Sequence, residues 1–416
     1  MKPGYKQTEV GVIPEEWEVK PLGELGQFKN GINKGKEDFG HGFPFINLMD
    51  VFGIPKVSTA TTELGLVNST AAERKLYELK GSDVLFVRSS VKPAGVGLTT
   101  LIPQDLVNTV FSGFLIRFRD AGLLSHEFKE HCFWDERFRN RLIARSSVSA
   151  NTNINQDALK QLQIALPPLP EQHAIAEALS DVDALLGALD RLIAKKRDLK
   201  QAAMQQLLTG QTRLPGFHGE WEVKRLGSLG AFLKGSGVKK DDAMSGDLPC
   251  VRYGEIYTHH HDVVRVFNSF LSASVAAAAT TLRKGDLLFA GSGETKEEIG
   301  KAVAFVHDCE AYAGGDIVIL RPEASDSVFL GYYLNSRPIQ KQKASRGQGD
   351  AVVHISAASL AAIEVSMPPL PEQTAIAEVL TEMDAELAML EQRQAKTRAL
   401  KQAMLQQLLT GAIRLV

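Results

Sequence analysis

The chain contains Pro167-Pro168-Leu169-Pro170-Glu171-Gln172, and the same six residues return as Pro368-Pro369-Leu370-Pro371-Glu372-Gln373. The second copy lies 201 residues further along (368 − 167), and the same offset carries Leu207-Leu208-Thr209-Gly210 to Leu408-Leu409-Thr410-Gly411. A repeat at a fixed offset decides the architecture before any local pattern is considered. Between these marks each copy is predicted to form one long helix, with a different segment in front of it.

The two predicted helices cover residues 170–209 and 371–410. Pro170 suits a first helical turn, Glu171 favours the positive end of the helix dipole, and Gly210 suits a C-terminal cap. Apolar residues at alternating spacings of four and three form a coiled-coil seam. The seams are Ile175, Leu179, Val182, Leu186, Leu189, Ile193 and Leu207 in the first helix, and Ile376, Leu380, Met383, Leu387, Leu390 and Leu408 in the second.

Both seams turn polar at equivalent places, at Lys196 and Lys200 in the first helix and at Thr397 and Lys401 in the second. Two helices with the same register and the same polar middle are predicted to pair with each other. The alternative is that each helix packs only on its own head. At about 1.5 Å per residue, such a helix is about 58 Å long and suits a spacer.

Two mixed heads precede the helices, at about 16–166 and 220–367. Short strand-like runs are separated by glycines, as in Val84-Leu85-Phe86-Val87 and Asp286-Leu287-Leu288-Phe289, and one helical stretch is expected before the last strand of each head. The heads share this frame but differ in their loops, which suits readers of two targets, although neutral drift is an alternative. The sequence therefore predicts an α+β chain of four parts, at 1–166, 167–212, 213–367 and 368–416.

The repeat is circular in its order. Glu16-Trp17-Glu18-Val19-Lys20 returns as Glu220-Trp221-Glu222-Val223-Lys224, directly after the first helix and its linker. The second helix has no such segment behind it, because the matching lead-in lies at the N-terminus instead. We therefore expect the two ends of the chain to meet and to complete a pseudo-two-fold object.

Composition limits the function classes only broadly. The 416 residues are 44% hydrophobic and 23% charged, with a net charge of −2, so charge alone does not predict nucleic-acid binding. No run of about 20 apolar residues and no secretory signal is present, and the three cysteines are far apart. These features predict a cytoplasmic protein without a disulfide framework, a membrane span or a cysteine-built metal site.

Polar and basic residues gather in the loops of both heads, where they could contact DNA. Arg137, Arg141 and Arg145 stand four apart on one predicted helix face, and the second head has a basic cluster at the equivalent place. Such side chains can bind phosphates, and Arg, Asn and Gln can read base edges, although a solvated helix face is the alternative. The candidates are Lys29, Asn30, Lys34, Arg88, Ser89, Ser90, Lys92, Arg137, Arg141, Arg145, Ser147 and Asn151 in the first head, and Lys234, Ser236, Lys239, Lys240, Ser292, Lys296, Arg337, Lys341, Lys343, Arg346 and Gln348 in the second.

Catalytic motifs are incomplete. Phe289-Ala290-Gly291-Ser292-Gly293 fits an F-x-G-x-G pattern of adenine methyltransferases, but the partner motif of a polar residue, Pro-Pro and an aromatic residue is missing. Gly300-Lys301 lacks the other residues of a P-loop. His259-His260-His261 lacks further ligands at metal-binding spacing, so a polar loop is the expected reading. We therefore expect no catalytic residue and no metal on this chain.

The combination resembles one known family. Two variable heads, each followed by a long helix that opens with Pro-Pro-Leu-Pro-Glu-Gln and closes with Gln-Leu-Leu-Thr-Gly, are similar to the specificity subunit (HsdS) of type I restriction-modification enzymes. The run Gly11-Val12-Ile13-Pro14-Glu15-Glu16-Trp17 and its looser echo from Gly216 to Trp221 also resemble that family. The resemblance covers nearly the whole chain.

The resemblance implies a non-catalytic DNA-recognition subunit. It implies two target recognition domains that each read one half of a bipartite site in double-stranded DNA, and an antiparallel helix pair as the ruler between them. Two modification subunits would supply S-adenosylmethionine and methylate adenine, and restriction subunits would use ATP and Mg²⁺. No cofactor is expected on this chain. A fused methyltransferase and a pure protein scaffold are the alternatives to this interpretation.

Overall fold

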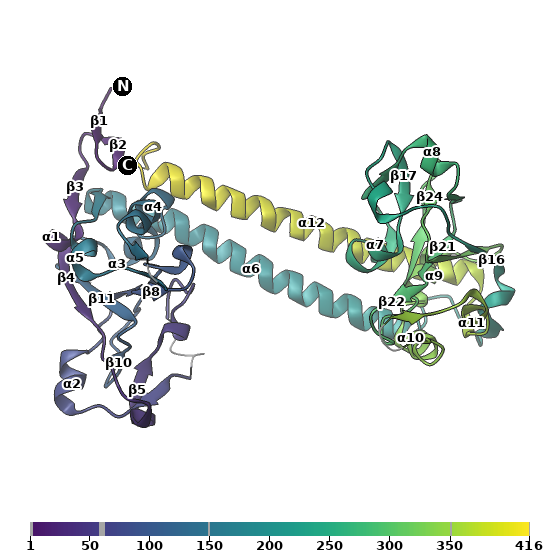
Figure 1. Ribbon diagram of the computed structural model, residues 1–416, viewed down its shortest axis with the longest axis horizontal. Coiled ribbons are helices and arrows are strands. Elements are labelled where there is room, and N and C mark those ends of the chain that lie inside the picture. Colours follow the sequence, from purple (N-terminus) through teal and green to yellow (C-terminus); the bar gives the residue numbers. More distant parts are fainter. Residues whose placement is uncertain (1–2, 58–62, 149, 350–351, 416) are drawn as a thin grey trace. The chain divides into compact units, whose positions relative to one another are not determined.

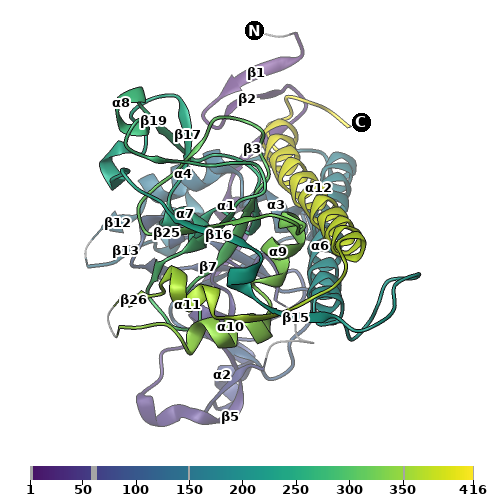
Figure 2. The same ribbon diagram turned by 90° about the vertical axis from the view of Figure 1, so that its right-hand side faces the viewer.

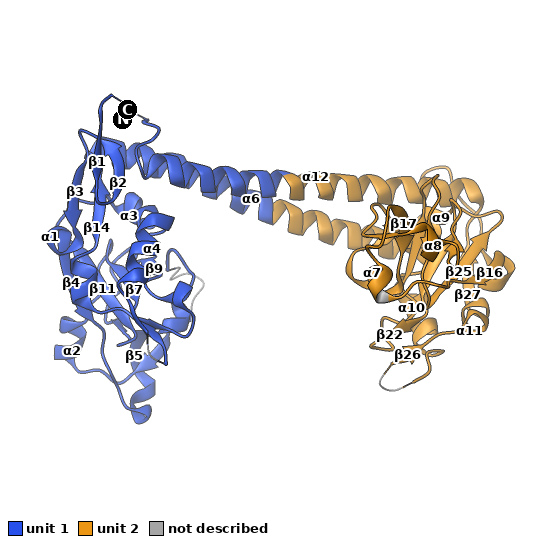
Figure 3. Ribbon diagram, turned by 45° about the horizontal axis from the view of Figure 1, so that its top comes forward, with its two compact units in different colours: residues 1–190, 393–416 blue, residues 191–392 orange. Residues whose placement is uncertain are grey.

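The computed structural model describes residues 3–57, 63–148, 150–349 and 352–415. These residues divide into two compact units (Figure 3). Unit 1 contains residues 1–190 and 393–416, and unit 2 contains residues 191–392. Because each long helix contributes one end to each unit, both units combine a mixed head with a segment of both helices.

The two long helices are α6 (Leu169–Leu207) and α12 (Leu370–Leu408), each 39 residues long. Each lies within two residues of its predicted range, and the two run side by side in an antiparallel pair (Figures 1 and 2). The predicted pairing is therefore confirmed. Leu189, Ile193 and Leu387 are buried, and Val182, Leu186, Met383 and Leu390 are half-buried.

The ends of the seam have a second role that the sequence analysis treated as an alternative. Ile175 and Leu179 belong to the core of unit 1, together with Leu408 from the far end of α12. Ile376 and Leu380 belong in the same way to the core of unit 2, together with Leu207. Each head is thus built on the start of one long helix and the end of the other.

The polar middle of the seam is a set of ion pairs. Lys200 pairs with Asp384 at 2.5 Å in unit 2, and the equivalent residues Lys401 and Asp183 pair at 2.6 Å in unit 1. Lys196 pairs with Glu386 at 2.7 Å. The Lys196–Glu386 and Lys401–Asp183 pairs are partly exposed and add little stability, whereas Lys200 and Asp384 are mostly buried. All of these ion pairs keep the lysines paired where the apolar seam is interrupted.

The repeated Pro-Glu-Gln motif clasps each helix start to a segment from elsewhere in the unit. In unit 1 the buried Glu171 accepts hydrogen bonds from Trp17 Nε1 at 2.7 Å and from Arg414 Nη2 at 2.8 Å. Arg414 lies beyond α12, and Tyr5 OH donates to Gly411 O at 2.8 Å, so the two ends of the chain meet. This meeting was expected from the circular order of the repeat.

Unit 2 builds the same clasp from its own residues. The buried Glu372 accepts two hydrogen bonds at 2.5 Å from Arg213, which follows α6. The Arg213 guanidinium lies 5.7 Å from the ring centre of Trp221. Arg213 and Arg414 are 201 residues apart, which is the offset of the repeat.

The glutamine of the motif ties each helix to a short helix of the head. Gln172 Oε1 accepts from the backbone N–H of Ser125, the N-cap of α3 (His126–Cys132), at 2.8 Å. Gln373 Oε1 accepts from Asp326, the N-cap of α9 (Ser327–Tyr333), at 3.0 Å. Each amide nitrogen also donates to a proline carbonyl at the start of the motif.

The head of unit 1, here called head 1, is built on a mixed set of small sheets. Its central sheet has the strand order β4-β11-β7-β9, and a second sheet has the order β10-β5-β6. The bounds are β4 (Gly26–Asn30), β11 (Leu115–Asp120), β7 (Val84–Val87), β9 (Thr99–Leu101), β10 (Val110–Phe111), β5 (Phe39–Ile46) and β6 (Gly65–Val67). Strands β3 (Glu18–Pro21) and β14 (Gln163–Leu166) pair next to the helices, and β1 (Tyr5–Thr8) and β2 (Gly11–Pro14) form the N-terminal hairpin.

The head of unit 2, head 2, repeats this frame with a larger sheet. Its central sheet has the order β16-β25-β21-β23-β18, and a second sheet has the order β19-β17-β24-β20. The bounds are β16 (Gly230–Lys234), β25 (Ile317–Pro322), β21 (Leu287–Ala290), β23 (Ala302–Phe305), β18 (Asp262–Val264), β19 (Ser269–Leu271), β17 (Leu248–Val251), β24 (Tyr312–Ala313) and β20 (Thr280–Thr281). Strands β15 (Glu222–Arg225) and β27 (Glu364–Met367) pair as β3 and β14 do.

One expectation about the heads is corrected. Where the sequence predicted a single helical stretch before the last strand, head 1 has α3, α4 (Glu136–Ala144) and α5 (Gln156–Lys160). Head 2 has α9, α10 (Arg337–Ala344) and α11 (Ala357–Ala361). The short helices are separate because capping side chains such as Ser125, Asp135 and Asn155 start each of them.

Candidate nucleic-acid interface

A small three-stranded sheet in head 1 brings together residues from two distant loops. Its order is β12 (Ser147–Val148), β13 (Thr152–Asn153) and β8 (Ser89–Ser90). The register places Ser90 opposite Thr152, and Ser89 opposite Asn153. The predicted candidates Arg88, Ser89, Ser90, Ser147 and Asn151 thus lie on one sheet or directly beside it, and Lys92 is exposed in the loop that follows β8.

Head 2 has the same construction with different side chains. Strand β22 (Ser292–Gly293) pairs with β26 (Val353–His354), and Gln348 bridges to His354. Ser292 Oγ lies 2.9 Å from His354 Nδ1. These residues border a pocket of about 310 Å³ that is also lined by Lys234, Arg346, Ser356 and Ser359. Four predicted candidates, Lys234, Ser292, Arg346 and Gln348, therefore line one concave surface.

The loops also expose apolar side chains that the sequence analysis did not single out. Val91 follows β8 and is 81% exposed, and Val148 in β12 is 78% exposed. Val352 before β26 is exposed as well. An exposed valine among Ser, Asn and Gln residues suits a surface that meets both polar base edges and thymine methyl groups.

A second group of candidates in head 1 is turned toward the protein itself. Lys34 forms an ion pair with Glu73 at 2.9 Å, and Lys29 Nζ lies 5.5 Å from the ring centre of Tyr77. Lys29 and Asn30 line a pocket of about 630 Å³ together with Arg117. Lys29 and Asn30 lie on β4, which belongs to the central sheet. This group is therefore not on the small sheet of β8, β12 and β13.

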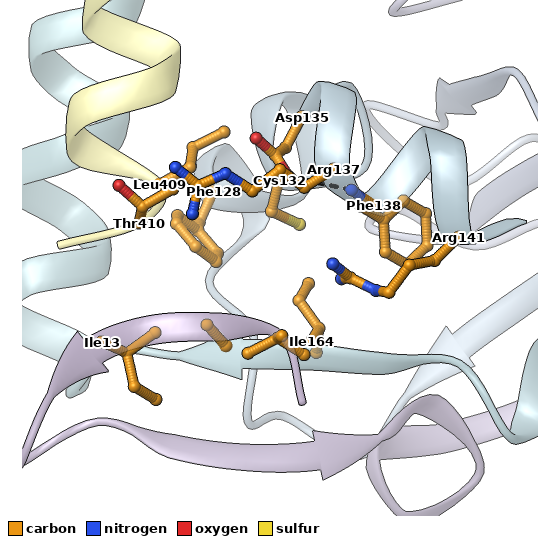
Figure 4. Close-up of a pocket in the computed structure, with 12 residues that line it drawn as sticks. Ile13, Phe128, Cys132, Asp135, Arg137, Phe138, Arg141, Ile164, Leu409 and Thr410 are labelled. Carbon is orange, nitrogen blue, oxygen red and sulfur yellow. Dashed lines mark hydrogen bonds between the residues drawn. The ribbon is translucent and has the colours of Figure 1, made fainter. Parts of the chain in front are cut away.

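The arginines of α4 contact residues of their own unit. Figure 4 shows Arg137 and Arg141 at a small pocket of about 30 Å³ beside Ile13 of the N-terminal hairpin and Leu409 after α12. Arg141 donates to Gln163 O at 3.1 Å, and Arg145 donates to Gln161 Oε1 at 3.0 Å. The three arginines thus do not form one free face, because two of them hold the segment that leads into β14.

Lys343 is a correction among the candidates. It is fully buried, and its Nζ donates to Gly300 O at 2.7 Å. Burial lowers the pKa of Lys343 to about 7. Since a phosphate contact needs an accessible ammonium, this side chain cannot be a DNA contact in the described fold. The equivalent place in head 1 is held by Leu142, which packs on Gly97 as Lys343 packs on Gly300.

The remaining candidates of head 2 are scattered. Ser236 Oγ donates to Ala278 O at 3.0 Å. Lys239 and Lys296 are exposed on separate loops, and Arg337 and Lys341 are exposed on α10. The side chain of Lys240 lies outside the described part of the chain. The F-x-G-x-G run forms the end of β21 and the start of β22. Its last residues, Ser292 and Gly293, therefore lie on the strand that pairs with β26. Among the described residues no group of three His, Cys, Asp or Glu side chains could hold a metal ion, and no helix is long and apolar enough to cross a membrane.

Sequence reasoning missed His354, Ser356 and Ser359 in the pocket of head 2. It also missed the clasp residues Arg213 and Arg414. A signal for the arginines was present, because both stand three residues after the Thr-Gly that ends each helix repeat. Nothing in the sequence signals His354, because only the pairing of β22 with β26 places it beside Ser292.

The family described as type I restriction modification DNA specificity domain matches this chain twice, at residues 14–195 and 218–398. A Methanocaldococcus jannaschii protein named as the MjaX specificity subunit of a type I restriction enzyme is 26% identical over 451 residues, covering 99% of this chain and 96% of the relative. The MjaVIII specificity subunit from the same organism is 21% identical over 425 residues, covering 97% and 94%. The Escherichia coli EcoKI specificity subunit is 25% identical over 194 residues, covering 44% and 41%.

Solved structures share the fold. The S subunit of a type I restriction-modification system from M. genitalium has a TM-score of 0.56 and 16% identity, with 98% of this chain and 99% of that chain covered. The HsdS subunit from Thermoanaerobacter tengcongensis has a TM-score of 0.52 and 18% identity, with 96% and 98% covered. At these identities the likeness establishes the fold.

The buried Lys343 predicts how stability depends on pH. The folded protein releases this proton near pH 7, whereas the unfolded chain keeps it up to the ordinary lysine value of 10.5. Between these values the unfolded state binds more protons, so the free energy of unfolding should rise with pH. Lys343→Leu, which copies Leu142 of head 1, should stabilise the protein at pH 6–7 by about 1–3 kcal/mol and flatten this rise.

Chemical denaturation at several pH values measures both effects. Lys341→Leu is the matched control, because Lys341 is exposed on the same helix. An unchanged pH dependence in Lys343→Leu would contradict the burial argument.

Proposed function

Because this chain belongs to the type I restriction-modification DNA specificity family, and is thus the DNA specificity subunit of such a system and its non-catalytic component, we propose that it reads a bipartite DNA site. Head 1 reads one half-site and head 2 reads the other. The helix pair holds two modification subunits and sets the spacing of the half-sites. In this proposal the modification subunits use S-adenosylmethionine, and the restriction subunits use ATP and Mg²⁺.

One observation supports the proposal that each head recognises its own half-site. Both heads present a hairpin and a neighbouring loop at the same place in the frame, but with different side chains. Head 1 offers Ser89 and Ser147, and head 2 offers Gln348 and His354. Because base edges are distinguished by the pattern of donors and acceptors that faces them, two different loop sets suit two different half-sites.

The contact set that we propose is narrower than the sequence candidates. In head 1 it contains Arg88, Ser89, Lys92, Ser147 and Asn151, with Val91 and Val148 as apolar contacts, whereas Ser90 is buried. In head 2 it contains Lys234, Arg346, Gln348 and His354, whereas Ser292 is buried behind His354. Basic side chains at the edge of each set would bind phosphates and fix the register, and the polar groups between them would read bases.

The helix pair offers a surface for the modification subunits. Leu185, Leu192 and Leu199 stand seven residues apart on α6, and they are 39%, 39% and 47% exposed. Seven-residue spacing keeps them on one face of the helix, outside the seam formed by Leu189 and Ile193. An exposed apolar stripe on a helix suits a helical partner. We assign this stripe to a modification subunit.

We propose that the two heads read their half-sites from one face of B-DNA. The half-site centres should then lie about one helical turn, or about 10 base pairs, apart. The intervening bases are unread but fixed in number. The paired helices are the elements that join the two heads, so their length would set this number.

Exchange of one head tests the two-headed reading. Replacing residues 16–166 by the same head from another family member should change one half of the recognised site and leave the other half intact. Methylome sequencing of a strain that carries the chain with its modification subunit gives the site directly. A change in both halves, or no methylation at a bipartite site with the wild-type chain, would overturn the proposal.

The phosphate contacts predict a salt dependence. Lys92→Ala and Lys234→Ala should each lower the slope of log affinity against log salt by about 0.9, because one released counterion is lost with each contact. Lys396→Ala, an exposed lysine on α12, should leave the slope unchanged. DNA binding by the complex with the modification subunit, titrated at several salt concentrations, measures it. Wild-type slopes in both head variants would remove these lysines from the contact set.

The apolar stripe predicts which leucines matter for assembly. Leu192→Glu should weaken binding of the modification subunit at least tenfold, which corresponds to about 1.4 kcal/mol, and leave thermal unfolding unchanged. Leu189→Glu is the contrast, because Leu189 is buried in the helix pair and its replacement should destabilise the chain itself. Calorimetric titration and melting curves separate the two effects. If Leu192→Glu kept the wild-type affinity, the modification subunit would have to bind another face of the helix pair.

A further inference from the structure

A single carboxylate on α12 ties head 2 to both long helices. Asp384 Oδ1 accepts from Lys200 Nζ on α6 at 2.5 Å. Asp384 Oδ2 accepts from Tyr332 OH on α9 at 2.5 Å and from Arg265 Nη2 after β18 at 3.0 Å. Figures 1 and 2 show α9 of head 2 next to α12. One side chain thus joins three elements that the sequence keeps far apart.

The groups around Asp384 are themselves held in place. Tyr332 is fully buried, and its ring lies 5.3 Å from Lys200 Nζ. Lys200 Nζ also lies 3.9 Å from Asp262, whose Oδ1 accepts from Asn335 Nδ2 at 2.9 Å. Tyr332, Lys200, Asp262 and Asp384 are buried or mostly buried, and the Arg265 side chain is 48% exposed. The connected hydrogen bonds between the buried groups have a defined geometry, because breaking one of them leaves a charge without its partner.

The carboxylate is ionised in the folded protein. Burial alone would raise the pKa of Asp384, but hydrogen bonds from Lys200 and Tyr332 and the charge of Arg265 hold that pKa below its ordinary value. Hydrogen bonds to an ionised acceptor are shorter and stronger than neutral ones. The contact of head 2 with α12 at this point is therefore directional as well as apolar.

Unit 1 has the ion pair between the two long helices. Within its described residues it does not have the hydrogen bonds from the head. Asp183 and Lys401 occupy the equivalent positions, 201 residues from Asp384 and Lys200, and they form the equivalent ion pair at 2.6 Å. The position of Tyr332 is held by His131, whose Nε2 lies 3.3 Å from Ser180 Oγ. Within the described residues, no side chain of head 1 donates a hydrogen bond to Asp183, whose side chain is 40% exposed against 18% for Asp384.

We propose that Asp384 is a positioning residue that fixes the orientation of head 2 on the helix pair and thereby restricts the protein to one spacer length between the half-sites. The inference rests on the proposed reading of a bipartite site. Tyr332 and Arg265 transmit the constraint from the carboxylate to the head. Head 1 lacks this anchor. It is held by the contacts that both heads share, the apolar core and the clasps of Glu171 and Gln172, and by the neutral contact of His131 with Ser180.

A small change in orientation is enough to change the spacing. A head of about 150 residues has a radius of gyration of about 15 Å, so its DNA-facing loops lie on the order of 20 Å from its attachment. A tilt of about 10° over 20 Å moves the loops by about 3.5 Å, close to the rise of one base pair at about 3.4 Å. Directional bonds resist such a tilt better than apolar contacts, which are not directional.

The test uses the full chain in complex with its modification subunit and reads the methylome. Asp384→Ala removes the carboxylate, and Tyr332→Phe removes only the hydroxyl that links head 2 to it. Asp183→Ala is the matched control, because it breaks the equivalent ion pair on the helices without touching a head. We expect both head 2 variants to raise the fraction of methylated sites with a spacer one base pair longer or shorter at least tenfold. Asp183→Ala should keep the single wild-type spacer.

The outcomes are distinct. A wild-type spacer distribution in Tyr332→Phe and Asp384→Ala overturns the inference, and so does equal relaxation in Asp183→Ala. If Asp384→Ala fails to assemble, Tyr332→Phe decides alone by the same criterion. An unspecific fold defect would lower methylation at all sites without changing the spacer, and this result also counts against a positioning role. If the wild-type complex methylates no bipartite site, the proposed function itself is overturned.

Discussion

Two buried carboxylates at the starts of the long helices are the constraint on which the rest of the structure depends. Glu171 and Glu372 have almost no exposed surface, so each needs a cation and hydrogen-bond donors inside the protein. Each receives an arginine from the end of the other long helix, and Glu171 also receives the indole N–H of Trp17. Because the acceptor and the cation come from different helices, this requirement brings an antiparallel pair together in both units.

The same constraint explains why the chain can begin and end within one unit. The clasp of unit 1 needs a tryptophan from before the first head and an arginine from after the second helix, so the two ends of the sequence must meet there. Unit 2 builds its clasp from the linker that joins Arg213 to Trp221. The two clasps share the arginine–glutamate pair, but only in unit 1 does the tryptophan donate its indole N–H to the glutamate.

The heads use the shared frame for different ends. Their buried parts repeat, down to a bidentate pair of Asp83 with Arg119 in head 1 and of Asp286 with Arg321 in head 2. Their hairpins carry different polar side chains, and we propose that these contact different base pairs. Head 2 differs further in the charged network at Asp384. Tyr332 and Arg265 of head 2 donate hydrogen bonds to Asp384, and within the described residues no side chain of head 1 donates one to the equivalent Asp183. The repeat thus gives both heads a shared frame, and we propose that the side-chain differences on that frame determine which bases each head recognises.

The repeat offset, the heptad seam and the turn residues at the helix ends were sufficient to predict both long helices, their pairing and the meeting of the termini, because these features depend on local periodicity and order. The family resemblance likewise rested on sequence alone. Tertiary structure decided which polar residues are available. Lys343, Arg141 and Arg145 look like surface cations in sequence. In the structure Lys343 is buried against Gly300, Arg141 donates to Gln163 at the start of β14, and Arg145 donates to Gln161 just before it. His354 and Ser292 become neighbours only through a strand pairing across 62 residues. Exposure and long-range pairing depend on how distant segments pack, and no local pattern in the sequence encodes that packing.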